Sequence, residues 1–330
     1  MKKKIIRLLQ FILFLGIGLW LFWLLYKDLD FSRLKKVLND VNYFWVLMSI
    51  IVTLLSYLSR TRRWILMTEP LGIKPPFRLT FVAIMTGYLA NLIIPRMGEV
   101  ARCGVLHRSS GTSFSSLIGT LVTERIIDLI MLLLLTTSLI LSQFDKINLF
   151  MGNNPAIRET ITNIILSPWL WILVFVVFVL IVVWWMRIRE TDFYKKIMTF
   201  FKSFIKGLQT IRNMEKKWEF IFHSVFIWFM YFLMLYTMFF AFGFTVKLPV
   251  GAAFMAFILG SYGMLAPINA GIGAWHFMVI QSLLVFGVST SDGEIFALLA
   301  HFVSTAFVVV VGLASLIALP FMPEKIPLKT

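Results

Sequence analysis

The sequence predicts an all-α polytopic membrane protein with about six full spans and two oppositely oriented re-entrant helical hairpins, arranged as an inverted-topology repeat. Hydrophobic residues make up 59% of the 330 positions and charged residues only 14%, whereas a soluble domain is roughly 45–50% apolar and about 25% charged. Two of the apolar regions are interrupted by proline, glycine and polar residues. A pair of interrupted segments in corresponding halves is the best pointer in a sequence to a transporter's binding site.

Six apolar stretches are long enough to cross a hydrocarbon core of roughly 30 Å, which needs about 20 helical residues. They are residues 5–26, 43–67, 114–142, 168–187, 219–244 and 294–319. The interruptions lie in two further apolar regions, 77–108 and 250–288. Although basic residues precede the first stretch, it is too long for a signal peptide and lacks an Ala-x-Ala cleavage site. We therefore expect it to be a retained first span.

Lysine and arginine predict the orientation in the membrane. Segment 187–218 holds nine basic residues against three acidic ones, which places it in the cytoplasm. All basic clusters fall on that side if 77–108 enters and leaves from the cytoplasm and 250–288 enters and leaves from outside. Both termini are then cytoplasmic, loop 143–167 is external, and we expect a multi-pass protein of the cytoplasmic membrane. The alternative is that each hairpin arm crosses fully, which gives ten helices and the same sidedness.

This order of elements describes one transmembrane domain, residues 1–330, made of half one (1–142) and half two (168–330) in opposite orientations. Residues 190–218 place apolar side chains on one helical stripe and most lysines elsewhere, which predicts an amphipathic helix in the cytoplasmic interface. We interpret this helix as a linker whose apolar face lies in the headgroups. Sensing of anionic lipid is the alternative.

The first interruption comprises Asn91, Pro95, Arg96, Gly98, Glu99 and Arg102. Pro95 cannot donate a backbone hydrogen bond and Gly98 permits a sharp turn, so we expect a hairpin tip whose free amides can bind an anion. Glu99 and Arg102 are three residues apart and can pair on one helical face.

The span 114–142 carries Glu124, Arg125 and Asp128. A charge at the centre of a membrane helix costs roughly 2.5–3.5 kcal/mol. We therefore expect these side chains to face the protein interior, to pair with each other (Arg125 with Asp128, three apart), or to meet the first hairpin.

The second interruption comprises Pro267, Asn269, Gly271, Gly273 and His276. Its small residues allow a close approach of the backbone. His276 is a candidate proton carrier, because histidine titrates near neutral pH. A buried histidine with satisfied hydrogen bonds is the commoner alternative.

Several classes of function are excluded or disfavoured by composition. The single Cys103 excludes an intramolecular disulfide and a cysteine metal cluster. No metal, cofactor or catalytic constellation is expected from the four histidines. The net charge of +15 indicates cytoplasmic loops and contact with anionic lipid headgroups rather than nucleic acid.

Taken together, the pattern Asn91…Pro95-Arg96-x-Gly98-Glu99-x-x-Arg102, the following Glu124-Arg125-x-x-Asp128 and the late Pro/Gly tract resemble the transmembrane region of lysylphosphatidylglycerol synthases, a flippase-like domain. The resemblance covers nearly the whole chain. It departs at Asn269-Ala270-Gly271, where the family often has Pro-Gly-Gly, and at His276, where an acidic residue is common. The resemblance implies lipid translocation without aminoacyl transfer, since no soluble domain is expected at either end.

The leading hypothesis is a translocase of a phospholipid or a lipid-linked polar headgroup, with the phosphate held by the Arg/Glu cluster at the first hairpin. Its expected partners are membrane lipids, above all anionic ones. A second copy of the chain, or a membrane synthase or glycosyltransferase, stays open as a protein partner. The alternatives are an ion-coupled transporter of a small solute, and an integral-membrane lipid-modifying enzyme or a partner of one.

Overall fold

The computed structural model describes residues 16, 20, 22–27, 29–94, 97–168, 171–172, 176, 215–266 and 269–322, and these residues form helices and connections without a β-strand. The predicted all-α fold class is confirmed for this part of the chain. The chain divides into two units, one of Met1–Gln143 with Met214–Thr330 and one of Phe144–Asn213. The first unit contains both interruptions.

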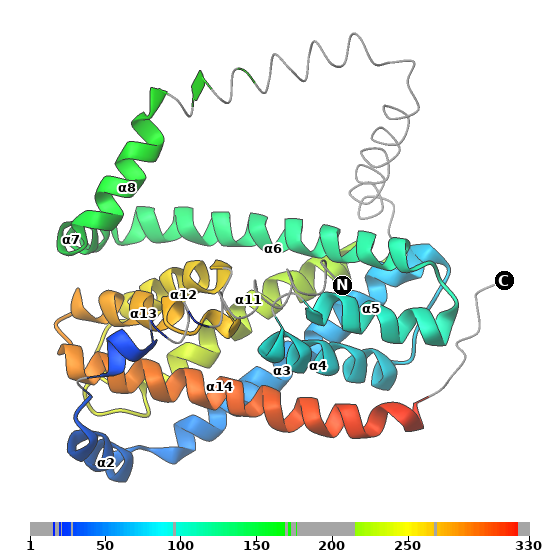
Figure 1. Cartoon of the computed structure of the whole chain (residues 1–330), viewed down its shortest axis with the longest axis horizontal. Coiled ribbons are helices and arrows are strands. Elements are labelled where there is room, and N and C mark those ends of the chain that lie inside the picture. Colours follow the sequence, from blue (N-terminus) through cyan, green and yellow to red (C-terminus); the bar gives the residue numbers. More distant parts are fainter. Residues whose placement is uncertain are drawn as a thin grey trace. The chain divides into compact units, whose positions relative to one another are not determined.

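The helices of the first unit are labelled in Figure 1. They are α2 (Phe31–Asp40), α3 (Tyr43–Thr68), α4 (Phe77–Ile93), α5 (Met97–Ser110), α6 (Phe114–Ser142), α11 (Lys217–Phe239), α12 (Val250–Leu265), α13 (Ala274–Leu284) and α14 (Thr290–Ala318). Two short 3₁₀ turns lie between helices, η1 (Glu69–Leu71) and η2 (Asn269–Gly271), and a third, η3 (Leu319–Phe321), follows α14.

Four stretches among the described residues are long and apolar enough to cross a membrane: α3 with η1, α6, α11, and α14 with η3. They agree with the predicted spans 43–67, 114–142, 219–244 and 294–319, and the chain is a multi-pass membrane protein. The predicted spans 5–26 and 168–187 and the predicted amphipathic helix 190–218 lie mostly outside the described residues.

Two helical hairpins occupy the two interrupted regions. Helix α4 contacts α5, and α12 contacts α13. The four arms have 17, 14, 16 and 11 residues, which is shorter than the roughly 20 residues of a full crossing. Pro95 and Arg96 at the first tip, and Pro267 at the second, lie outside the described residues.

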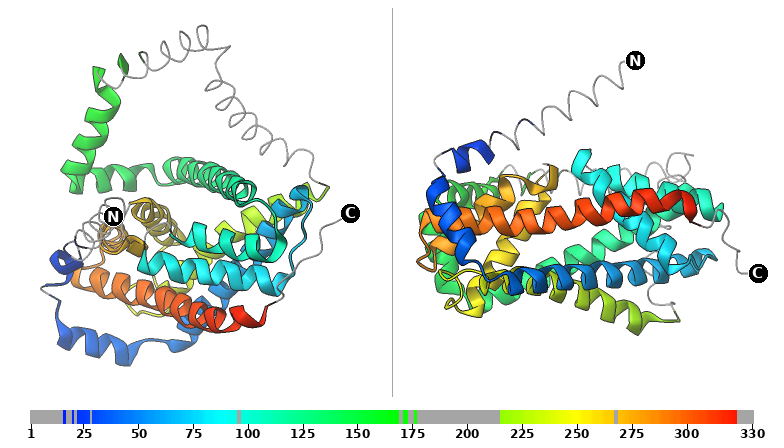
Figure 2. Two further views of the ribbon diagram at one scale, coloured as in Figure 1. Left: turned by 45° about the vertical axis from the view of Figure 1, so that its right-hand side comes forward. Right: turned by 90° about the horizontal axis from the view of Figure 1, so that it is seen from below.

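Contacts in one half have counterparts in the other. Helix α3 contacts α4 and α5 contacts α6, as α11 contacts α12 and α13 contacts α14. Between the halves, α4 contacts α14 as α12 contacts α6, and the hairpins lie between α6 and α14 (Figures 1 and 2). Ser49 Oγ donates to the Met234 carbonyl at 2.8 Å and Ser59 Oγ lies 2.8 Å from His223 Nδ1, so α3 and α11 are antiparallel. This pattern is what an inverted repeat requires.

Helix α2 was not predicted, although its start signal is present in the sequence. The Asp30 carboxylate accepts hydrogen bonds from the N–H groups of Ser32 and Arg33 at 2.8 and 3.1 Å, as a helix N-cap does. A further bond from the Ser32 hydroxyl lowers the pKa of Asp30. The Arg33 guanidinium binds the Asp292 carboxylate through Nε at 3.0 Å and Nη2 at 2.7 Å, and this pair ties α2 to the first turn of α14.

We expect this ion pair to contribute about 0.5–1 kcal/mol of stability, because exposed pairs are screened by water. The Arg33 side chain is 46% exposed and that of Asp292 is 12% exposed. A double-mutant cycle with Arg33→Gln and Asp292→Asn, followed by thermal unfolding in detergent, measures the coupling. A coupling energy indistinguishable from zero would contradict the assignment.

The second unit contains α7 (Phe144–Asn153) and α8 (Pro155–Leu166). The connection predicted over 143–167 thus contains two short helices, neither of which is long enough to cross the membrane. Pro155 is preorganised for the first position of a helix, and Asn154 before it donates from Nδ2 to the Phe150 carbonyl at 2.9 Å. These local features favour short helices in a segment whose hydrophobicity is too low for a full span.

Candidate functional site

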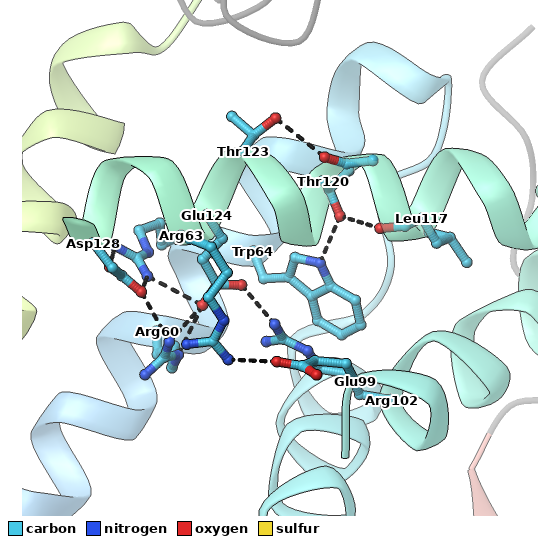
Figure 3. Close-up of polar contacts among 12 residues, drawn as sticks. Arg60, Arg63, Trp64, Glu99, Arg102, Leu117, Thr120, Thr123, Glu124 and Asp128 are labelled. Carbon is cyan, nitrogen blue, oxygen red and sulfur yellow. Dashed lines mark hydrogen bonds and ion pairs between the residues drawn. The ribbon is translucent and has the colours of Figure 1, made fainter. Parts of the chain in front are cut away.

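A buried carboxylate, Glu124, lies at the centre of the candidate site (Figure 3). It lies ten residues after the start of α6 at Phe114, which is about 15 Å along the helix. Its Oε1 accepts from Arg60 Nη2 at 2.7 Å and from Arg63 Nη2 at 3.1 Å, and its Oε2 accepts from Arg102 Nη2 at 2.8 Å. Because Glu124 is 1% exposed and the arginines are 1–5% exposed, these charges are removed from water.

Asp128 extends this cluster by one turn of α6. It accepts from Arg63 Nη1 at 2.8 Å and from Arg60 Nη2 at 3.2 Å. Its side chain is 16% exposed, so this end of the cluster is less enclosed by protein than Glu124. Arg60 Nη1 also donates to the Tyr231 hydroxyl on α11. We call Arg60, Arg63, Arg102, Glu124 and Asp128 the arginine cluster.

The arginine cluster holds three positive and two negative charges, a net charge of +1. Burying an ion costs several kcal/mol unless a partner offsets the lost hydration. In addition, Arg63 Nε is buried without a hydrogen-bond partner among the described residues. The cluster therefore has electrostatic and hydrogen-bonding capacity for a further anion.

Aromatic rings position two of the guanidinium groups. The Arg102 guanidinium lies 5.0 Å from the Trp64 ring centroid, and that of Arg60 lies 5.6 Å from the Tyr88 ring centroid. Trp64 is itself fixed, since its Nε1 donates to Thr120 Oγ1 at 3.0 Å. Such cation–π contacts strengthen when water is excluded, so they hold the arginines in place without neutralising them.

A second ion pair joins α5 to α6 beside the cluster. Arg125 Nη2 lies 2.9 Å from Glu99 Oε1, and the two side chains are 53% and 29% exposed. The local pairs Glu99–Arg102 and Arg125–Asp128, which the spacing allowed, are replaced by pairs between α5 and α6, and these meet the other expectation that the charges of α6 contact the first hairpin. Glu99 and Arg102 share the face of α5 that meets α6. Each pairs with a residue of α6, and in this way the buried Glu124 gains Arg102 as a positively charged partner.

Two glycines bring α4 and α5 together and thereby place Arg102. A Cβ added to Gly87 would lie 2.8 Å from the Gly98 carbonyl oxygen and 3.3 Å from Arg102 Cβ. A Cβ added to Gly98 would lie 2.6 Å from Asn91 Cγ. The Gly98 N–H donates to Asn91 Oδ1 at 2.6 Å. Cys103, the neighbour of Arg102, is a fully buried free thiol.

Residues 10–312 match the protein family described as "Lysylphosphatidylglycerol synthase TM region". The chain belongs to this family. The membership indicates a lipid-related membrane protein and confirms the resemblance seen in the motifs. No curated protein sequence and no solved structure matches the chain.

The second interruption of this family member forms a separate feature. Ala270, Gly271 and Gly273 have left-handed φ angles of 52°, 68° and 87°. His276 is 1% exposed, and its Nδ1 accepts from the Gly273 N–H at 3.3 Å. His301 Nε2 lies 2.9 Å from the Ala270 carbonyl oxygen, and the two histidine rings are 4.5 Å apart.

Some of the predicted site residues thus meet and others do not. Asn91, Gly98, Glu99, Arg102, Glu124, Arg125 and Asp128 come together on α4, α5 and α6. The second group does not join them: no hydrogen bond or ion pair between described residues connects His276 with the arginine cluster. The backbone of Asn269 begins η2. Within the described ranges, no group of three or more His, Cys, Asp or Glu side chains could hold a metal ion.

Arg60, Arg63 and Tyr231 were not among the predicted site residues. The available signal was the spacing of Arg60 and Arg63, which puts both on one helical face. Arg62 lies on another face and pairs with Glu219 at 2.5 Å, half-exposed.

Proposed function

We propose that the protein is a translocase (flippase) that moves a phospholipid or a lipid-linked polar headgroup between the leaflets, with the phosphate held by the arginine cluster. The observation that carries this proposal is the buried excess of three arginines over two carboxylates. One phosphodiester carries one negative charge and would make the cluster neutral. Arginine also suits this ligand, because its planar guanidinium donates two parallel hydrogen bonds to phosphate oxygens.

The exposed fractions of the side chains support entry of a headgroup into the arginine cluster from the side of the Glu99–Arg125 pair. The side chains of Arg125 and Glu99 are 53% and 29% exposed, that of Asp128 is 16% exposed and that of Glu124 is 1% exposed. A headgroup that arrives at the Glu99–Arg125 pair thus passes from a partly exposed edge to an interior enclosed by protein. There the acidic side chains balance the arginines or meet a cationic part of the headgroup.

Gating is assigned to the two hairpins. Helix α5 carries both Glu99 and Arg102, and each binds α6, so movement of this arm would break two ion pairs and uncover the cluster. Helix α4 of the first hairpin also contacts η2 of the second. In this scheme α4/α5 enters from the cytoplasm, α12/α13 enters from outside, and both termini lie on the cytoplasmic side of the cell membrane.

The direct test measures movement of fluorescent phospholipids in vesicles containing the purified protein, for anionic and zwitterionic lipids separately. Arg102→Gln is expected to slow the movement of anionic lipid by about 10- to 100-fold, as loss of a hydrogen bond to a charged group implies. Glu99→Gln is the second variant. Arg78→Gln is the matched control, because Arg78 is exposed in the first turn of α4 of the same hairpin. Lipid movement no faster than in empty vesicles, across several lipid classes, would refute the proposal.

One contact bears on the enzyme alternative, which requires a nucleophile and a base. Ser59 Oγ lies 2.8 Å from His223 Nδ1, and Glu219 Oε1 lies 3.9 Å from His223 Nε2. However, Ser59 lies inside α3, where backbone amides are bound within the helix, so they cannot stabilise an oxyanion beside it. We propose that this contact ties α3 to α11 and that the protein is not an enzyme. Appearance of a modified product from labelled lipid would overturn this assignment, and uptake of a polar solute without lipid movement would favour a solute transporter.

A further inference from the structure

Each half of the chain has a pair of contacting residues at the same two helix positions, one on the second arm of its hairpin and one on the helix that follows. Glu99 is the third residue of α5, which starts at Met97, and Arg125 is the twelfth of α6, which starts at Phe114. In the second half the third residue of α13 (from Ala274) is His276, and the twelfth of α14 (from Thr290) is His301. Both pairs are in contact, at 2.9 Å between Arg125 Nη2 and Glu99 Oε1 and at 4.5 Å between the imidazole centroids.

The second hairpin therefore carries two imidazoles where the first carries an ion pair. We propose that His276 and His301 are positioning residues that form an acid-released latch on the tip of the second hairpin. Its role in lipid movement rests on the proposed translocase function, whereas the latch itself is a property of the hairpin.

The hydrogen bonds specify neutral rings in the latched state. A backbone N–H can only donate, so His276 Nδ1, which faces the Gly273 N–H at 3.3 Å, carries no proton. A carbonyl can only accept, so His301 Nε2 carries the proton that it shares with the Ala270 oxygen at 2.9 Å. This bond holds Ala270 at a φ of 52°, a conformation that alanine adopts only when its surroundings impose it.

A further proton on His276 opposes the latch directly, whereas one on His301 would enter at Nδ1, where Thr305 Oγ1 at 3.3 Å can accept, and opposes the latch through repulsion. On His276 it would have to enter at Nδ1, where it breaks the contact with Gly273. Two imidazolium ions with ring centroids 4.5 Å apart also repel each other. Because water can solvate both cations once the tip has moved, acidification favours the open hairpin.

The surroundings offer these charges aromatic rings, which attract a cation only weakly, and no carboxylate in contact. The rings of Phe22 and Tyr26 lie 5.6 Å from that of His276, and Trp275 lies 5.4 Å from it. The groups around the tip come from four elements. Next to α13 lie Tyr26, whose hydroxyl faces the Glu294 carbonyl and is near enough to sense the Glu294 carboxylate, and Thr305 on α14. Met264 lies on α12, and the one charged residue of α4, Arg78, is in its first turn. No hydrogen bond or ion pair between described residues brings a carboxylate to either imidazole.

The test follows the accessibility of the tip to a membrane-impermeant maleimide. Cys103→Ser removes the single cysteine of the sequence, and Ile272→Cys, half-buried between the two tip glycines, reports opening. Phe31→Cys, at a position 75% exposed on α2, corrects for the pH dependence of the thiol itself. The corrected labelling rate of the otherwise unchanged protein is expected to rise from pH 7.5 to 5.5, by up to about tenfold per pH unit if opening takes up one proton.

Two double variants show whether the histidines cause the rise. His276→Gln with His301→Gln keeps an acceptor for Gly273 and a donor for Ala270 but cannot titrate. His276→Glu with His301→Arg copies the Glu99–Arg125 pair of the first half. Both are expected to give slow labelling that is independent of pH. A flat profile for the unchanged histidines, or a rise that persists in both double variants, would overturn the latch.

The labelling assay requires no lipid movement, so it separates the two proposals. A pH-dependent tip in vesicles that move no lipid would keep the latch and refute the translocase function. Lipid movement with a pH-independent tip would refute the latch alone.

Discussion

Glu124→Gln is expected to destabilise the folded protein by about 3–5 kcal/mol, the usual cost of removing one partner from a buried ion pair. Arg60, Arg63 and Arg102 all bind this carboxylate. The substitution would raise the net charge of the arginine cluster from +1 to +2 with little loss of volume. Thermal unfolding of the detergent-purified protein, and the yield of folded protein, measure the effect.

The matched comparison is Glu99→Gln, which removes an acid of the same type from the partly exposed Glu99–Arg125 pair. A loss of about 1 kcal/mol or less is expected there, because solvent screens the charges. Similar unfolding temperatures for the two variants would show that burial of Glu124 does not control the stability of the cluster.

Gly98→Ala is expected to separate the arms of the first hairpin. The added Cβ would lie 2.6 Å from Asn91 Cγ, well inside contact distance, and forced overpacking costs about 1–3 kcal/mol. Because Arg102 lies one turn beyond Gly98 on α5, the displacement would weaken its bond to Glu124. Loss of lipid movement should therefore accompany loss of stability, and both are measured on the same vesicle preparation and in detergent.

Gly104→Ala is the control on the same helix, since a Cβ there meets nothing within 4 Å. Alanine is a better helix former than glycine by about 0.5–1 kcal/mol, so this variant is expected to be as stable as the native protein or slightly more stable. Equal behaviour of the two alanine variants would refute the close approach of α4 and α5.

Much of the fold was predictable because a long run of apolar residues identifies a membrane helix. The four described spans fall within a few residues of the predicted ones, and both interruptions are helical hairpins. Helix α2 was not predicted because it is short and polar, and its main sequence signal is the N-cap residue Asp30. Charge counting predicts sidedness but cannot show which helices pack against each other.

That limit explains why the arginine cluster was predicted only in part. The cost of a charge inside a span correctly indicated that Glu124 and Asp128 face the interior. Their partners Arg60 and Arg63 come from another helix, 61–68 residues away in sequence, and a spacing rule within one helix cannot find them. Glu99 and Arg102 illustrate the same point, because both follow the local pairing rule in spacing but bind α6 instead.

The burial of Cys103 has a practical consequence for studying the native protein. The sequence contains one cysteine, and it lies fully buried on the arm that carries Arg102. In the gating proposed above, separation of α5 from α6 would expose this thiol to alkylating reagents, whereas an arm held in place would protect it. Substrates could therefore be ranked by how they change the rate of alkylation and the mass of the intact chain, with no engineered probe. Under the proposed translocase function, the native thiol would thus report which lipids change the position of α5.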